Sequence, residues 1–294
     1  MSGLLATHML GMEFNRTVCV HPSYESFYTA FRPRDESCGR LFACERPSLT
    51  EKIRLLNFGD QQDECHLQKL LASSKRILWV EANTYPRWTS IPDSLRFADH
   101  YHLQPALLDI LPWKVLPPRQ VVHLRVPDDG TDIRKGLDET SLKNLGERLP
   151  STTYLVTNKV QLFDWFAERY GWAHPPWKGV SHSSLAISWG DRRGRDIPRI
   201  ARTREAERTG DLQLWADWYT ISQCQVLIHT HSEFSSSAAY WMKIKDSRIF
   251  DGVDPETGKL CLRPEELHRH NPAAPLSRRQ RNASIPDLNR LKNC

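Results

Sequence analysis

The second half of the chain alternates between short apolar runs and amphipathic stretches, and this alternation constrains the fold more than any other feature. Apolar runs of strand length occupy residues 121–125, 153–157 and 226–230. The spacing of apolar side chains predicts helices over 141–149, 160–170, 212–223 and 235–243. Strands that alternate with helices pair in parallel, so we predict an α/β protein with a parallel sheet.

The first half is less regular. Residues 2–12 have the pattern of a helix that leads into a short strand at 16–20. A helix is predicted over 63–75, a strand over 76–82 and short helices within 91–111. Pro117-Pro118 then breaks the chain just before the run at 121–125, so we predict a boundary between a domain of residues 1–117 and a domain of residues 118–267.

The charge of the chain is concentrated at its end. The formal net charge is +5, and from Arg263 onward seven Lys/Arg stand against three Asp/Glu. The body is therefore close to neutral, which argues against a broad basic face for nucleic acid. Residues 268–294 lack apolar periodicity and are predicted to be a disordered basic tail.

Cysteines and sequons give an expectation about the compartment. Seven Cys are present without a CxxC pair, so a zinc site is not expected. Four of these Cys fall within the first 65 residues, and sequons begin at Asn15 and Asn282, which favours the secretory pathway. No apolar run reaches membrane length, and neither GxGxxG nor GxxxxGK[ST] occurs.

His123 and Arg125 form the first candidate site. They lie two residues apart near the end of a predicted strand, so both side chains point to one face. Ligands bind at the carboxyl ends of strands in open α/β sheets, and a guanidinium there can grip a diphosphate with paired hydrogen bonds. The alternative is an ordinary surface ion pair.

An acidic turn follows directly and contains Asp128, Asp129 and Asp132. A carboxylate here could take the proton from an attacking hydroxyl, or it could hold a metal. The alternative is a solvated loop that needs polar residues to turn.

A third candidate runs from Asp217 to Ser237. The predicted helix and strand lead to Thr230-His231-Ser232-Glu233 just before the next helix, where hydroxyls and amides can bind phosphate. The alternative is helix capping, which is compatible with phosphate binding. Thr157 and Asn158 end a neighbouring strand and are expected to line the same crevice.

In their order and spacing these segments resemble the GDP-fucose-dependent fucosyltransferases, the superfamily of α1,6-, plant-type and protein O-fucosyltransferases. The similar segments are SGLLATHMLGMEFNRTVCV, VVHLRVPDD, TYLVTN and DWYTISQCQVLIHTHSEFSSSAA, within residues 2–245. The resemblance implies a GT-B fold, in which two Rossmann-like domains face a cleft and the C-terminal domain binds the donor. The Gly/Asn/Arg opening motif of the family is missing, so we expect the N-terminal, acceptor-side domain to be truncated.

The resemblance also implies roles for residues. Arg125 would hold the diphosphate, His123 would lie beside the nucleotide, and Asp217 would read the guanine edge. Thr230, Ser232 and Glu233 would lie at the phosphates. Such enzymes invert the configuration at the sugar carbon and generally need no metal, so neither metal nor cofactor is expected.

Several positions depart from the family pattern. The second Arg of the family pair is Val126 here, the aspartate of its Ala-Thr-Asp strand is Asn158, and one serine is replaced by Glu233. The family base falls near Ile133, which makes Asp132, with Asp128 as a second catalytic candidate, the expected base.

The sequence therefore predicts an inverting transferase that moves fucose from GDP-fucose to a glycan or protein hydroxyl. We expect no nucleic-acid partner, a membrane link only through a missing N-terminal anchor, and, if that segment is missing, a Golgi or secretory-pathway location. One alternative is a homologue with impaired catalysis that binds a nucleotide or glycan. Another is an interaction protein that acts through its basic tail.

Overall fold

The computed structural model describes residues 1–13, 16–20, 24–35, 50–55, 77–82, 91–126, 137–177, 204–230 and 232–265. The chain divides into two compact units. Among the described elements, the first unit contains α1, β2 and β3, and the second consists of residues 22–34 and 97–265. The predicted tail at 268–294 lies outside the described residues.

The first unit contains a helix and two paired strands. The helix α1 spans Ser2–Glu13 and buries Leu5. The strands β2 (Thr50–Leu55) and β3 (Ile77–Ala82) pair in parallel along their whole length. The sequence predicted α1 and β3 closely, but the strand predicted over 16–20 is wrong, because those residues form neither strand nor helix. The helix predicted over 63–75 lies outside the described residues.

The second unit is built on a five-stranded sheet with the order β6-β5-β7-β8-β9. The strands are β5 (Gln120–Leu124), β6 (Tyr154–Thr157), β7 (Val226–His229), β8 (Asp246–Val253) and β9 (Leu260–Pro264). The first four run parallel and β9 runs antiparallel to β8. The sheet is therefore α/β as predicted, with a closing antiparallel strand that no apolar pattern indicated.

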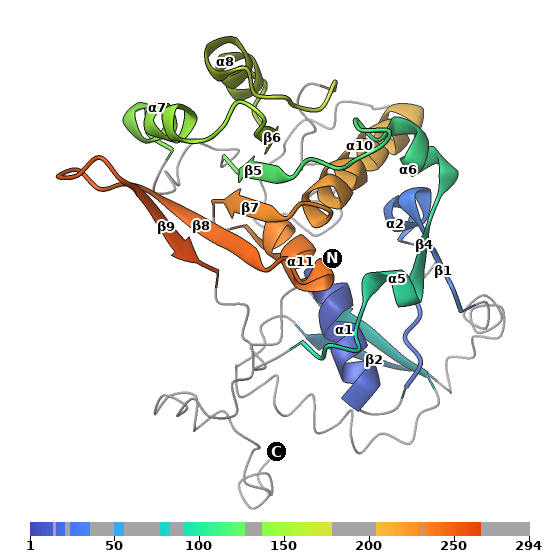
Figure 1. The fold of residues 1–294 in the computed structure, drawn as a ribbon. Helices are drawn as coiled ribbons and strands as arrows, with labels where there is room; N and C mark the ends of the chain where they lie inside the picture. Colours follow the sequence, from blue (N-terminus) through green and yellow to red (C-terminus); the bar gives the residue numbers. More distant parts are fainter. Residues whose placement is uncertain are drawn as a thin grey trace, which may run out of the picture. The chain divides into compact units, whose positions relative to one another are not determined.

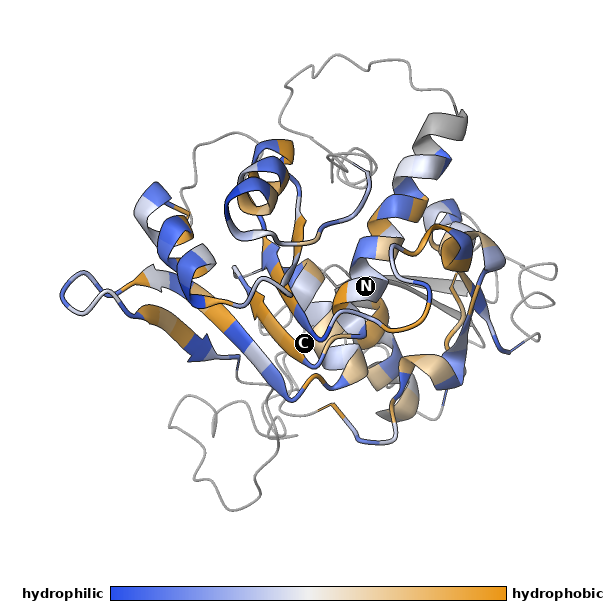
Figure 2. Ribbon diagram, turned by 45° about the horizontal axis from the view of Figure 1, so that its top comes forward, coloured by the Kyte–Doolittle hydropathy of each residue, from blue (hydrophilic) through white to orange (hydrophobic). Residues whose placement is uncertain are grey.

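Helices cover both faces of this sheet (Figure 1). The helices α7 (Glu139–Arg148) and α8 (Val160–Tyr170) pack on one face of the sheet. The helices α10 (Arg204–Ser222) and α11 (Glu233–Met242) pack on the other face. The helices on both faces bury β5 and β6 almost throughout. This is why the sequences of these strands are continuous apolar runs. Orange strand residues between mixed-colour helices show this pattern in Figure 2.

Local signals explain where the helices begin and end. The Asp138 carboxylate accepts a hydrogen bond from the Ser141 amide at 2.9 Å and caps α7. Gly171 ends α8 with a φ of 69°, a left-handed conformation that glycine adopts without strain. The helix predicted over 160–170 therefore has the observed bounds.

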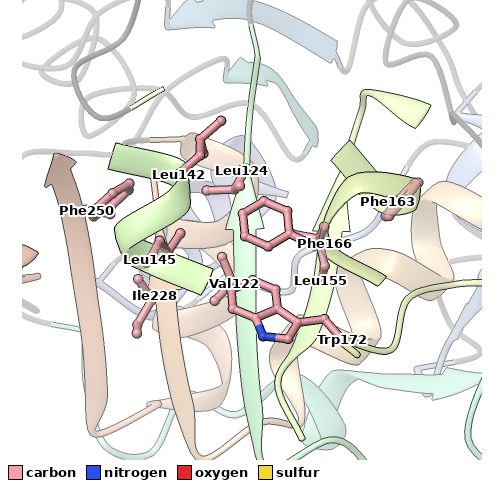
Figure 3. Packing of buried hydrophobic residues seen from close by; sticks show 10 residues of the cluster. All are labelled: Val122, Leu124, Leu142, Leu145, Leu155, Phe163, Phe166, Trp172, Ile228 and Phe250. Atoms are coloured by element: carbon pink, nitrogen blue, oxygen red, sulfur yellow. The ribbon is translucent and has the colours of Figure 1, made fainter. Parts of the chain in front are cut away.

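The α7/α8 face of the sheet is closed by an apolar core. Figure 3 shows Phe166 and Trp172 beside the β5 and β6 residues, with the α7 residues nearer to Phe250. The rings of Phe166 and Trp172 stack with 4.4 Å between centroids. The complete cluster is Val122, Leu124, Leu142, Leu145, Leu155, Phe163, Phe166, Trp172, Ile228 and Phe250.

A second, aromatic core lies around α10. Five short elements contribute to it: α2 (Glu25–Ala30), β1 (Phe31–Pro33), α5 (Phe97–His100), β4 (Tyr101–Leu103) and α6 (Pro105–Ile110). The indole N–H of Trp215 donates to the Ser26 carbonyl at 2.7 Å. Edge-to-face contacts join Phe27, Phe31, Phe97, Trp215, Trp218 and Trp241. This core belongs to the second unit, which contains residues 22–34 and 97–265, while the domain boundary at 117 stays a prediction.

None of the helices in the described part of the chain combines the length and the apolar character needed to cross a bilayer.

Candidate functional site

The winding of the sheet reverses between β5 and β7. From β5 the chain moves outward to β6, and it then crosses back to β7 on the other side of β5. Ligands of open α/β sheets bind outside the carboxyl ends of the strands at such a switch point. The residues that follow β5, β6 and β7 here are Arg125, Asn158 and Thr230.

Side chains from both neighbouring strands hold the exit of β5. The Arg125 amide donates to Thr230 Oγ1 at 2.8 Å, and Thr157 Oγ1 donates to the Leu124 carbonyl at 2.7 Å. Asn158 makes a two-way clip with Val126, because its Oδ1 accepts from the Val126 amide at 2.9 Å and its Nδ2 donates to the Val126 carbonyl at 2.7 Å. The backbone at Arg125 is therefore fixed before any ligand binds.

The clip explains one departure from the family pattern. An asparagine both donates and accepts, whereas an ionised aspartate only accepts. A carboxylate at 158 would face the Val126 carbonyl without a proton to share. The amide of Asn158 is therefore matched to the backbone of this chain at Val126.

His123 and Arg125 differ in exposure. Arg125 is half-buried, and its Nη1 donates to the Val126 carbonyl at 3.1 Å. His123 is only 1% exposed, and its ring lies 5.6 Å from that of Phe234 on α11. Arg125 thus lies at the strand exit, while His123 packs beneath α11 as part of the interior.

The turn from β7 into α11 brings together three of the predicted phosphate-site residues. Thr230 is buried and accepts from Arg125, and Ser232 is the N-cap residue of α11. The Ser232 side chain makes no capping bond, while its carbonyl accepts from the Ser236 amide at 2.9 Å. Glu233 is exposed in the first turn, where the amides of a helix N-terminus favour negative charge.

Asp217 lies on α10, which leads directly into β7. Its carboxyl is buried and accepts a hydrogen bond from the Trp177 indole N–H at 3.2 Å. Burial raises the pKa of the Asp217 carboxyl well above its usual range, although the bond from Trp177 opposes this. Burial also raises the pKa of Tyr154, and the neighbouring Asp217 adds to that effect.

The acidic turn and part of the β7–α11 turn lie outside the described residues. This applies to Asp128, Asp129, Asp132 and His231. The role of Asp128 or Asp132 as the base therefore stays a prediction. Across the ranges that the structure describes, no group of three or more His, Cys, Asp or Glu side chains has the arrangement of a metal site.

Sequence reasoning missed the buried pair His229 and Glu265. His229 ends β7, and its Nε2 lies 3.2 Å from Glu265 Oε2. His229 carried a weak signal, as a histidine inside an apolar run, but Glu265 follows β9, a strand that no periodicity predicted. The position of Glu265 depends on β8 and β9, two strands that the sequence analysis did not predict.

No family model and no curated protein matches this chain. Among solved structures, the chain is similar to NodZ α-1,6-fucosyltransferase co-crystallized with GDP, with a TM-score of 0.49 and 13% identity over 90% of this chain and 93% of that chain. It is also similar to fucosyltransferase NodZ from Bradyrhizobium, with a TM-score of 0.47 and 13% identity over 89% of this chain and 92% of that chain. A mutant of Arabidopsis thaliana FUT1 in complex with GDP has a TM-score of 0.43 and 12% identity, covering 87% of this chain and 68% of that chain. The two NodZ structures are named as fucosyltransferases.

Proposed function

We propose that this protein is a glycosyltransferase that moves fucose from GDP-fucose to a hydroxyl of a glycan or protein, with inversion at the sugar carbon. The observation that carries the proposal is the switch point, where the Arg125 amide is bonded to Thr230 at the carboxyl ends of parallel strands. The choice of fucose and GDP follows the resemblance of the sequence motifs.

In this proposal the diphosphate lies between the β5 exit and the first turn of α11. The Arg125 guanidinium binds it through paired hydrogen bonds, and the amides of α11 add the positive end of a helix. Both groups are positioned where negative charge grows as the bond from sugar to GDP breaks. Cationic and amide donors at that place stabilise the leaving group without a metal ion.

Asp217 reads the base in the same proposal. On binding, Asp217 releases its proton to solvent, and the carboxylate then accepts from both N1–H and the 2-amino group of guanine in place of its bond from Trp177. Inosine diphosphate lacks the 2-amino group and should bind more weakly than GDP. This difference in affinity should disappear in Asp217→Ala, which has no side-chain acceptor.

The acceptor hydroxyl attacks the sugar carbon from the side opposite the diphosphate. The new bond to the acceptor oxygen forms as the bond to GDP breaks, and a carboxylate takes the hydroxyl proton. We assign this base to Asp132, with Asp128 as the second candidate. Measuring transfer by Asp132→Asn and Asp128→Asn decides between them, because the base variant should lose turnover while it keeps GDP affinity.

The partners and the location extend the proposal. The acceptor is a glycan or a protein, and the first unit belongs to the acceptor side of a two-domain GT-B enzyme. Cys19 forms a disulfide, which supports an oxidising compartment such as the secretory-pathway lumen.

The central test is transfer from GDP-fucose by purified protein, with a panel of glycan and protein acceptors and donor hydrolysis as the second readout. Arg125→Ala should lower GDP affinity and the transfer rate by about a hundredfold, because a charge-assisted pair is lost. The matched control is Arg248→Ala, which removes an exposed arginine paired with Asp246 on β8. Equal rates in Arg125→Ala and wild type would remove the proposal, and GDP binding without turnover would select a binding protein instead.

A further prediction concerns Glu233. Its carboxylate stabilises the first turn of α11 but repels a diphosphate at the same place. Glu233→Gln should therefore bind GDP several-fold more tightly and lose about 0.5 kcal/mol of stability. Titration calorimetry and urea unfolding measure the two changes, and weaker GDP binding in Glu233→Gln would contradict a diphosphate at this helix end.

A further inference from the structure

Beneath the β7–α11 turn lies a buried polar network that the proposed mechanism does not use. His229 is fully buried at its centre, and Glu265 is its acidic partner, with a side chain only 5% exposed. Ser235 and Ser236 from α11 and Ser247 from β8 complete the network. It joins β7, α11, β8 and the end of β9.

The carboxylate of Glu265 is ionised. Burial alone would raise the pKa of Glu265, but hydrogen bonds from His229, Ser236 and Ser247 and the charge of His229 outweigh this and lower it. Ser236 Oγ donates to Oε1 at 2.5 Å, and Ser247 Oγ donates to Oε2 at 2.7 Å. The remaining neighbour of Oε2 is His229 Nε2, which therefore carries a proton.

The second ring nitrogen also faces an acceptor. His229 Nδ1 lies 3.0 Å from the Thr230 carbonyl oxygen, an atom that can only accept. It lies equally close to Ser235 Oγ, whose own proton is directed at the Ser232 carbonyl, 3.1 Å away. Each ring nitrogen therefore faces an acceptor, and this geometry is that of an imidazolium, a ring that donates from both Nδ1 and Nε2.

This geometry differs from a serine nucleophile activated by a histidine base. Such a base needs an unprotonated nitrogen toward the serine, whereas Nδ1 here points its proton at Thr230 and Ser235. Ser235 is also fully buried, so no substrate reaches it. The network is suited to fixing the backbone around it.

The network holds two carbonyls of the turn. The Thr230 carbonyl accepts from the imidazolium, and the Ser232 carbonyl accepts from Ser235. Thr230 is the same residue whose hydroxyl accepts from the Arg125 amide. The pair thus fixes both sides of the turn, with its positive member next to the turn and its negative member next to β9.

We propose that His229 and Glu265 are positioning residues, an ion pair that holds the β7–α11 turn in the conformation that binds the donor diphosphate. The proposal rests on the proposed function, because it names what shapes the phosphate part of that site. Because the carbonyls of Thr230 and Ser232 bond to side chains of the interior, they do not face the diphosphate, and hydrogen-bond donors can face it instead. The imidazolium adds a fixed positive charge behind them.

Other titratable groups face the pair from the neighbouring elements. His123 is the register partner of His229 on β5, so both rings lie on the same face of the sheet. Tyr240 on α11 has its pKa raised to about 12, first by burial and then by the charge of Glu265. Tyr240 is therefore neutral at pH 7, and Glu265 is the anion of the network.

The first experiment needs no variant. Nitrogen-15 chemical shifts of His229 at pH 7, in protein labelled on the ring, should place both Nδ1 and Nε2 in the range of protonated nitrogens. In Glu265→Gln one nitrogen should move to the unprotonated range, because the anion that holds the second proton is gone. A neutral ring in the wild-type protein overturns the proposal.

The second experiment separates positioning from general stability by comparing GDP with guanosine. Glu265→Gln should weaken GDP binding by about tenfold or more, because a charge-assisted bond is lost, while guanosine binding stays unchanged. Ser235→Ala, which leaves the ion pair in place, should give a smaller loss for GDP alone. The matched control is Asp251→Asn, which breaks the exposed pair of Arg263 with Asp251 on the same two strands and should leave both affinities unchanged.

The two proposals fail in different ways. If wild-type protein binds GDP and Glu265→Gln binds it equally well, the positioning role is wrong and the proposed function stands. If wild-type protein binds neither GDP nor guanosine, the proposed function fails, and the positioning role fails with it.

Discussion

At the scale of single residues, the chemistry of this site depends on which groups donate and which accept. Asn158 holds Val126 because an amide does both, and in the positioning proposal His229 holds Thr230 because both its ring nitrogens donate. Neither role follows from residue type alone, since each needs a particular backbone atom opposite the side chain. Two predictions belong to this scale.

Asn158→Asp should destabilise the second unit by about 1–3 kcal/mol, because the new carboxylate faces the half-buried Val126 carbonyl. Urea unfolding measures the loss, and GDP affinity should fall with it. Asn144→Asp is the matched control, since Asn144 donates to the Thr140 carbonyl at an exposed position on α7. Equal losses in the two variants would show that the clip does not matter.

Asp217 should make stability depend on pH. Burial raises the pKa of this carboxyl in the folded state, so the folded protein holds a proton that the unfolded chain releases above about pH 4. The contribution of Asp217 to the free energy of unfolding therefore falls as pH rises from there to the folded pKa. Asp217→Asn should remove this slope in urea unfolding between pH 4 and pH 8, and an unchanged slope would contradict a protonated carboxyl.

At the scale of elements, apolar periodicity predicted most of the strands that are buried on both faces and most of the helices that cover them. The strands β5, β6 and β7 and the helices α7, α8 and α11 were expected within a few residues of their observed bounds. α10 begins at Arg204, earlier than the expected 212, because its first turns carry polar residues that give no apolar signal. β8 and β9 were missed because strand pairing at a sheet edge gave no continuous apolar run to read.

A glycine in α7 tests the packing of two elements. A Cβ at Gly146 would collide with the ring of Tyr170 at the end of α8. Gly146→Ala should therefore cost about 1–3 kcal/mol despite the better helix propensity of alanine. In a Tyr170→Ala background the same change should become stabilising, which a double-mutant cycle measures.

The matched control lies in α10, where no atom of the described residues lies within 4 Å of a Cβ at Gly210. Gly210→Ala should stabilise the protein by about 1 kcal/mol, the difference in helix propensity alone. Thermal unfolding reports both changes. A stabilising Gly146→Ala in the wild-type background would show that the Tyr170 ring moves aside freely.

At the scale of the whole molecule, some of the contacts that join distant segments could be expected from the sequence and others could not. Arg125, Thr230 and Ser232 were expected near one another because strand ends of a parallel sheet meet at one edge, and the hydrogen bonds join Arg125 with Thr230. The grouping of residues 22–34 with α10 could not be expected, because it depends on contacts such as Trp215 with Ser26 across 189 positions. The base remains a prediction from motif spacing.

The aromatic core predicts how fragments behave. A fragment of residues 118–267 lacks Phe27, Phe31, Phe97 and Tyr101, which pack together and onto Trp215 and Trp218. It should bind a hydrophobic dye and show red-shifted tryptophan fluorescence. Fusing residues 22–34 through a flexible linker to residues 97–265 should restore a cooperative thermal transition, and a cooperative 118–267 fragment would place the boundary at 117 after all.

The clip at Val126 also matters for engineering. Because side chains of β6 and β7 secure the last residues of β5, whatever segment follows starts from a set position and direction. A library that randomises residues 127–136 and keeps Thr157, Asn158 and Thr230 unchanged would vary the segment that holds the proposed base while the sheet stays intact. In a selection of this library for new acceptors, the fold needs only to hold Arg125 and Val126 in place at the start of the variable segment.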